Sequence, residues 1–304
     1  MRVKCGGPLV LLSRLDAFRD SICLRDARGR SSRPALVRTR MGDQNVLRVD
    51  GSFTVLQRFD VSPAEGCAFV TTTGDLNPIH TEDTVISGAM TAARFLLLPE
   101  ILVPGLAVKS LRVKFRAFSR YGRPTVNRYL FRPNAQGAFD IQFSAYQTGT
   151  VVADGVAKTA LSPGGDKNAA PLEACESAHT VQAWLESLRL RSDLTFGAIG
   201  HGYPRAFLAS LPSGEMVRHG GAGGLLNVLD LEFPEAGVPA MEASGSPTVS
   251  VEPSRPRNTF RRVLTQVASG MVTYCRGSAT VLLGMFKSHE TVPGQAMAPT
   301  SASA

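Results

Sequence analysis

Cysteine is the first residue type that this sequence uses sparingly. Its five cysteines lie far apart, their number is odd, and no CxxC pair occurs. A disulfide framework or a zinc site is therefore not expected, and a reducing compartment fits best. Long apolar runs are also missing, since none reaches the roughly 20 residues that a membrane helix needs. We expect a cytoplasmic protein without a membrane span, with organelle targeting by the arginine-rich N-terminus left open.

Acidic residues are absent from one long stretch. Between Ile101 and Phe139 there is no aspartate or glutamate, but there are eight basic residues: Lys109, Arg112, Lys114, Arg116, Arg120, Arg123, Arg128 and Arg132. With a formal net charge of +8, the chain favours anionic partners. A surface that binds phosphate groups and a solvated face of a sheet explain these eight basic residues equally well. Nucleic acid is a lesser alternative, because no nucleic-acid motif is recognised.

The length and composition are those of a globular protein of one or two domains. The chain has 304 residues, of which 43% are hydrophobic and 19% charged. Its first 40 residues contain nine arginines and one lysine. We expect Met41 to be the true start, and a transit peptide or a basic arm is the alternative. We expect a disordered N-terminal extension at residues 1–45 and a first domain at 46–162. A linker at 163–173, a second domain at 174–287 and a disordered tail at 288–304 should follow.

Regular elements are predicted from Val46 onward. The stretch Val46–Phe59 predicts two strands joined by an Asp-Gly turn. Ser62 and Glu65 have the spacing of a capping box, which predicts a helix with Cys67–Val70 on its buried side. Gly74-Asp75 should end that helix.

A second helix should begin at Ser87 and be buried. Residues Phe95–Leu98 are apolar on every side, which predicts a core helix, and Pro99 and Pro104-Gly105 are expected to end it. From Val108 to Ala117 apolar residues alternate with basic ones, the pattern of a half-buried strand. Three further strands are expected at residues 126–132, 138–147 and 151–161. Together these elements predict an α+β fold.

The two halves of the chain resemble each other weakly. Ile86–Pro99 aligns without gaps on Ile199–Pro212, at an offset of 113 residues, and Asp154–Leu161 aligns on Arg276–Leu283 at 122. We interpret this as a tandem duplication. Chance similarity between two amphipathic halves is the alternative.

One segment concentrates ionisable and turn residues. Asp75, Asn77 and His80 lie within six residues around a proline turn. A carboxylate and an imidazole around one water make a pair for general acid–base catalysis. Asn77 can fix the loop through backbone hydrogen bonds. The helix entrance at Ser87-Gly88 offers unpaired N–H groups to an oxygen that gains negative charge. Ordinary turn chemistry with a structural histidine would explain the same residues.

The octapeptide Thr73–His80 (TGDLNPIH) resembles the hydratase motif of the MaoC-like, (R)-specific enoyl-CoA hydratase family. The resemblance implies a hot-dog fold, in which an antiparallel sheet wraps around one central helix. It also implies that Asp75 and His80 form the catalytic dyad, that Asn77 supports them, and that Ser87 and the Gly88 N–H bind the thioester at the helix entrance.

The resemblance further implies the substrate. The enzyme would be a hydro-lyase that interconverts trans-2-enoyl and (R)-3-hydroxyacyl thioesters, as in fatty acid or polyketide metabolism. Acyl-CoA or an acyl carrier protein would be its partner, and Arg112, Lys114 and Arg116 would contact the phosphates. No metal or redox cofactor is implied, because CoA or phosphopantetheine enters as part of the substrate.

The chain also departs from the family pattern. The connection Thr81–Ile86 is shorter than in the family, and Ser87 stands where histidine precedes glycine. At offset 113, the second half has Leu188, Leu190 and Asp193 in place of the motif residues. We therefore expect two tandem hot-dog copies that form a pseudo-dimer with one working half. A homodimer of such subunits is compatible with this arrangement.

Three points stay open at this stage. His201 precedes a glycine, as the family histidine does, so it has either a catalytic or a structural role. A hot-dog acyl-CoA thioesterase would use the same pocket. A catalytically silent acyl-binding or assembly subunit would also agree with the short loop and the degenerate second half.

Overall fold

The structure is a computed structural model of the chain. It describes residues 9–11, 21–25, 39–41, 44–48, 52–82, 84–102, 106–161, 178–188, 204–220, 224–234 and 247–283. The predicted linker (163–173), the predicted tail (288–304) and His201 lie outside these ranges. The predicted N-terminal extension contains the three strands β1 (Leu9–Leu11), β2 (Ser21–Arg25) and β3 (Thr39–Met41), although we expected it to be disordered.

Ten antiparallel strands form the main sheet, in the order β11-β12-β13-β10-β6-β9-β8-β7-β5-β2. Their bounds are β2 Ser21–Arg25, β5 Phe53–Phe59, β6 Leu106–Phe115, β7 Thr125–Pro133, β8 Phe139–Gln147, β9 Thr150–Leu161, β10 Leu225–Glu232, β11 Thr248–Pro253, β12 Phe260–Ser269 and β13 Val272–Leu282. A small sheet contains β1 Leu9–Leu11, β4 Gln44–Arg48 and β3 Thr39–Met41.

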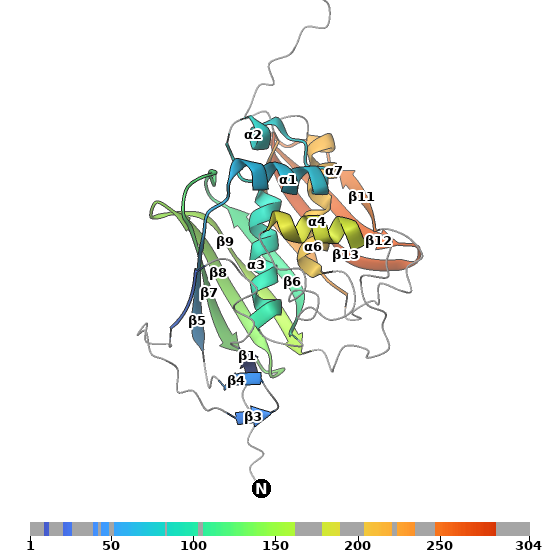
Figure 1. The fold of residues 1–304 in the computed structure, drawn as a ribbon. Coiled ribbons are helices and arrows are strands. Elements are labelled where there is room, and N and C mark those ends of the chain that lie inside the picture. The colour runs from blue at the N-terminus through green and yellow to red at the C-terminus, as the bar shows by residue number, and fades with distance from the viewer. Residues whose placement is uncertain are drawn as a thin grey trace, which may run out of the picture.

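The helices cover one face of the main sheet (Figure 1). They are α1 Pro63–Thr73, α2 Pro78–Thr81, α3 Gly88–Leu102, α4 Ala178–Ser187, α6 Arg205–Ser210 and α7 Pro212–Gly220. Helix α3 lies along the sheet, with α6 packed beside it, and α4 packs on α1. Every residue of α3 from Ala89 to Leu102 is buried, as its apolar run predicts. The architecture is therefore an antiparallel sheet around a central helix.

The strand order of the second half repeats that of the first. From the middle of the sheet outward, the first half runs β6-β9-β8-β7 and the second β10-β13-β12-β11, with β6 and β10 paired antiparallel. A Cβ atom on Gly155 would overlap the Arg112 carbonyl oxygen, and one on Gly277 would overlap that of Asp230. Gly155 and Gly277 are 122 residues apart, which is the offset of the aligned closing strands. Tandem duplication remains a prediction, and this topology supports it.

The halves share one hydrophobic core, and buried polar groups also join them. The core cluster includes Phe95 from the first half and Phe207 from the second. Between α3 and α6, Arg205 Nη1 lies 3.4 Å from Glu100 Oε1, and the Glu100 side chain is 3% exposed. Burial raises the pKa of Glu100 above its ordinary value, although the Arg205 charge opposes that shift.

Most predicted strands are confirmed, including the half-buried β6, whose Arg112 and Lys114 face solvent. One local prediction is wrong and two are right in part. The Val46–Phe59 hairpin does not form, because β4 pairs with β1 and β3 whereas β5 pairs with β2 and β7. Pro99 lies inside α3 instead of ending it, and the helix ends at Leu102, ahead of Pro104. On the predicted buried side of α1, Phe69 and Val70 are buried, but Gly66 and Thr73 complete that side in place of Cys67 and Ala68.

Candidate active site

Helix α1 places Asp75 by ending at Thr73, two residues before it. Ser62 accepts a hydrogen bond from the Glu65 N–H and Glu65 accepts one from the Ser62 N–H, so the predicted capping box is present. At the other end, Gly74 has a left-handed backbone with φ 71°, which glycine adopts without steric cost. The chain therefore turns sharply at Gly74, and Asp75 points into the protein with 1% exposure.

Asn77 positions the histidine by starting a second helix. Its side-chain oxygen accepts a hydrogen bond from the Ile79 N–H at 3.4 Å, as an N-cap residue does. Pro78 follows as the first residue of α2, where its missing N–H has no cost. His80 thus lies on a short helix and not, as expected, on an irregular loop. The predicted backbone role of Asn77 is present in the structure.

Asp75 and His80 come together in the interior. His80 Nε2 lies 3.5 Å from Asp75 Oδ2, and His80 is 6% exposed. The other ring nitrogen, Nδ1, lies 2.8 Å from the Val85 carbonyl oxygen. A carbonyl can only accept, so Nδ1 carries a proton. In the neutral imidazole, Nε2 is then the unprotonated nitrogen, and it faces the carboxylate.

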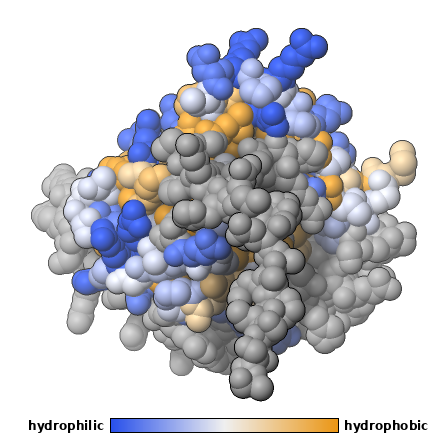
Figure 2. All heavy atoms as spheres, turned by 90° about the horizontal axis from the view of Figure 1, so that it is seen from above, coloured by the Kyte–Doolittle hydropathy of each residue, from blue (hydrophilic) through white to orange (hydrophobic). Residues whose placement is uncertain are grey.

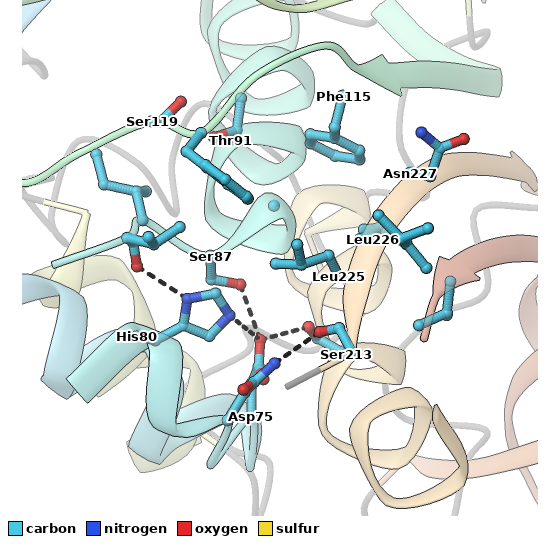
Figure 3. A pocket seen from close by; sticks show the side chains of 18 of the residues that line it. Asp75, His80, Ser87, Thr91, Phe115, Ser119, Ser213, Leu225, Leu226 and Asn227 are labelled. Atoms are coloured by element: carbon cyan, nitrogen blue, oxygen red, sulfur yellow. Dashed lines mark hydrogen bonds and ion pairs between the residues drawn. The ribbon is translucent and has the colours of Figure 1, made fainter. Parts of the chain in front are cut away.

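The two oxygens of Asp75 have different surroundings (Figure 3). Oδ2 accepts hydrogen bonds from the Ser87 hydroxyl at 2.9 Å and from the Ser213 hydroxyl at 2.6 Å. Oδ1 is buried and has no hydrogen-bond partner among the described residues. A buried carboxylate oxygen without a donor is costly, so Oδ1 is suited to accept from a molecule that enters the site.

The entrance of α3 forms another wall of the site. Ser87 Oγ accepts from the Ala89 N–H at 3.2 Å, as predicted for a capping residue. The Gly88 N–H, at the first position of α3, donates to no described residue. A Cβ atom on Gly88 would lie 3.2 Å from the Phe115 ring and 3.3 Å from Leu226 Cδ2, so a larger residue would crowd the space there.

These groups line a cavity of about 330 Å³ between the two halves. Residues of the first half contribute the polar end and Phe115. The second half contributes Ser213 and Met216 from α7, Leu225 and Leu226 from β10, and Leu282 from β13. In Figure 3, His80, Ser87 and Ser213 converge on Asp75, while Phe115 and Leu226 lie farther from it and Leu225 lies between them and the polar groups. The cavity is therefore mainly apolar and carries its ionisable groups at one end.

Ser213 was not predicted from the sequence. It is 138 residues from Asp75 in the chain, and no motif surrounds it. The run Pro212-Ser213-Gly214 does indicate a helix start, but nothing local relates that start to Asp75.

The surface near the site mixes hydrophilic and hydrophobic side chains. Figure 2 shows hydrophobic atoms between projecting hydrophilic groups on the end of the molecule that carries α1, α2 and α7. Leu76, between Asp75 and Asn77 in the chain, is 69% exposed. Phe118 lines the cavity and is 39% exposed, so the cavity reaches the surface beside it.

The basic residues predicted to bind phosphate are placed unequally. Arg116 lines the cavity, and its guanidinium bonds the Asp154 carboxylate at 2.7 and 3.2 Å. That bond raises the pKa of Arg116 further above its ordinary value. Arg112 lies 3.9 Å from Asp230, and Lys114 is exposed on the outer sheet face. Of these three, only Arg116 reaches the site.

Comparisons with known proteins identify the fold. No family model matches the chain, and no curated protein is similar to it in sequence. A solved MaoC-like dehydratase superposes with a TM-score of 0.54 over 78% of this chain and 98% of its own, at 10% identity. A MaoC-like dehydratase from Phytophthora capsici gives 0.49 over 76% and 95%, at 12% identity. HtdX of Mycobacterium tuberculosis gives 0.48 over 75% and 98%, at 11% identity.

The first of these similarities, together with the strand order, shows that the chain has the α+β hot-dog fold. The expectation from the Thr73–His80 motif is thereby confirmed for the fold. Among the residues that the structure describes, no helix has the length and apolar character needed to cross a membrane.

Proposed function

We propose that this chain is an acyl-thioester hydratase/dehydratase that interconverts trans-2-enoyl and (R)-3-hydroxyacyl thioesters. One observation carries the proposal: a buried carboxylate and an imidazole nitrogen lie 3.5 Å apart at the polar end of an apolar cavity. Burial of two ionisable groups is costly unless they are paired and hydrogen-bonded, and such costly groups are commonly retained at functional sites. The open acceptor at Asp75 Oδ1 supports a water or substrate ligand at that place.

The geometry supports acid–base catalysis on one water. A water held by Asp75 and His80 would lose a proton to the dyad while its oxygen bonds to C3 of the enoyl group. The C2–C3 π electrons move toward the thioester carbonyl, whose oxygen becomes an enolate. The Gly88 N–H at the start of α3 would stabilise that oxygen. The proton held by the dyad then passes to C2, and the hydroxyacyl thioester is complete. Dehydration is the reverse.

The short connection Thr81–Ile86 supports the proposal, although it differs from the family pattern. It brings the Val85 carbonyl 2.8 Å from His80 Nδ1, which fixes the ring and its tautomer. The connection is itself held, because the Val85 N–H donates to the Ile79 carbonyl at 3.2 Å and the Ile86 N–H donates to Ser119 at 2.8 Å. A shorter loop is thus compatible with an oriented histidine.

The substrate is expected to enter from the side of Arg116. The apolar walls suit an acyl chain, and the cavity of about 330 Å³ has the size of a small-ligand site. The pantetheine arm of CoA or of a carrier protein would leave the site past Arg116 and Phe118. The phosphates would then compete with Asp154 for the Arg116 guanidinium.

The test is a panel of trans-2-enoyl-CoA substrates followed by loss of the enoyl absorbance. Asp75→Asn and His80→Ala are each expected to lower kcat by about 100- to 10,000-fold, the usual contribution of a general acid or base. Leu76→Ser changes an exposed residue between them in the chain and is the matched control. Circular dichroism should show that all three variants fold.

Wild-type rates in either dyad variant would refute the proposed mechanism. Release of free thiol without a change in enoyl absorbance would show a thioesterase instead. Binding of acyl-CoA without turnover in the unmodified protein would show a silent acyl-binding subunit.

A further inference from the structure

We propose that Ser213, on the half that lacks the motif, is a positioning residue that orients the Asp75 carboxylate. The inference rests on the proposed function, since it concerns the same acid. It changes the role of the second half, because that half would complete the catalytic group as well as cover the core. The observation that carries it is the 2.6 Å hydrogen bond from Ser213 Oγ to Asp75 Oδ2.

The hydroxyl matters because a carboxylate rotates easily. The last side-chain torsion of aspartate has a broad, roughly two-fold preference. Here two donors, Ser87 and Ser213, reach the same oxygen, Oδ2, and leave Oδ1 without a partner among the described residues. Ser87 directly precedes α3, whereas Ser213 lies on α7. Together they make the two carboxylate oxygens inequivalent, with one held by the protein and the other left for the water.

Ser87 and Ser213 hold the carboxylate differently. Ser87 Oγ accepts from the Ala89 N–H at 3.2 Å and donates to Asp75, so its position is tied to the start of α3. For Ser213 the described contact is the one to Asp75, and it is 0.3 Å shorter than the Ser87 bond. The Ser213 side chain is buried, with 7% exposure, so water offers little substitute for its hydroxyl.

The backbone around Ser213 is fitted closely to the motif loop. A Cβ atom on Gly214 would lie 2.6 Å from the Gly74 carbonyl oxygen and 2.8 Å from that of Thr73, so only glycine allows α7 to approach so near. Nearby, Asn77 Nδ2 donates to the Gly224 carbonyl at 2.7 Å. The second half therefore contacts the Thr73–His80 motif at both Gly74 and Asn77, and these contacts keep the Ser213 hydroxyl beside Asp75.

The test compares three variants of the full chain in the enoyl-CoA assay. Ser213→Ala should lower kcat by roughly 10- to 100-fold, the value of a hydrogen bond to a charged group, with KM within about two-fold. Ser213→Thr keeps the hydroxyl and should restore most of kcat. Ser210→Ala is the matched control, because Ser210 is also buried in the same half and its hydroxyl donates to the Phe207 carbonyl, away from the site.

Crystal structures of the wild type and Ser213→Ala give a readout that does not depend on turnover. The Asp75 carboxylate is expected to rotate in Ser213→Ala and to stay in place in Ser210→Ala. Wild-type kcat in Ser213→Ala would overturn the proposal, and so would an equal loss in Ser210→Ala. If the wild type hydrates no enoyl thioester, the proposed function fails; an unmoved carboxylate would then overturn the positioning role as well, and a rotated one would support it.

Discussion

Replacing Asn77 by aspartate separates a local effect from a tertiary one. As the N-cap residue of α2, Asn77 has a local role that aspartate performs equally well. Its amide nitrogen, however, donates to the buried Gly224 carbonyl in the other half at 2.7 Å. Aspartate has no donor when ionised. The substitution would therefore place a carboxylate oxygen against a carbonyl oxygen.

The size of the effect follows from these two atoms. The lost hydrogen bond contributes about 1 kcal/mol, and a buried carbonyl left without a donor costs about 1–3 kcal/mol. We expect Asn77→Asp to lower the free energy of unfolding by about 2–4 kcal/mol in total. If Asn77 acted only as a helix cap, the same substitution should leave the free energy of unfolding nearly unchanged.

Urea denaturation followed by tryptophan fluorescence measures this difference. The single tryptophan, Trp184, is fully buried on α4, which packs on α1. Asn258→Asp makes the same chemical change at an exposed residue and should stay within about 0.5 kcal/mol of the wild type. If Asn77→Asp were as stable as Asn258→Asp, the contact with Gly224 would not stabilise the fold and the reasoning would be refuted.

Two further predictions concern the packing of the halves. Burial raises the pKa of Glu100, so the folded state holds this proton more tightly than the unfolded chain. The stability that comes from the bound proton is therefore lost as pH rises from about 4.5 through the raised pKa. Urea unfolding at several pH values should show a smaller loss of stability in Glu100→Gln than in the wild type, and an equal pH dependence in both proteins would contradict the raised pKa. Gly155→Ala and Gly277→Ala should each destabilise the sheet by about 1–3 kcal/mol, because the added methyl meets a neighbouring strand's backbone; thermal unfolding checks this, and an unaffected Gly277→Ala would argue against the close strand approach in the second half.

Much of the local structure around Asp75 and His80 was predictable from interactions between residues that are close in the chain. The capping box of Ser62 and Glu65, the stop at Gly74 and the hydrogen bond from a nearby backbone group to Asn77 depend on residues within four positions of one another, although the helix α2 that Asn77 caps was not predicted. Such interactions are encoded locally, so their spacing in the chain was sufficient. The Thr73–His80 motif also brought Asp75 and His80 into one hypothesis before any geometry was known.

Predictions that depended on distant partners were less successful. The hairpin expected at Val46–Phe59 looked locally sound, but each strand pairs with others elsewhere in the chain. Pro99 was expected to end a helix that continues to Leu102 within the buried core, where tertiary packing overrides the proline penalty. In the first case pairing with distant strands outweighed a local turn signal, and in the second the burial of α3 outweighed the local preference of proline.

The sequence by itself therefore predicted the α+β fold class and the central helix, because periodicity and turn chemistry act over a few residues, and the resemblance of its Thr73–His80 motif singled out Asp75 and His80 as candidates. Only the tertiary structure decided which groups hold those residues. The hydroxyl that completes the environment of Asp75 comes from Ser213, 138 positions away, and the carbonyl that binds Asn77 comes from Gly224. Hydrogen bonds of this kind depend on how two halves dock, and docking is set by the whole buried surface between them.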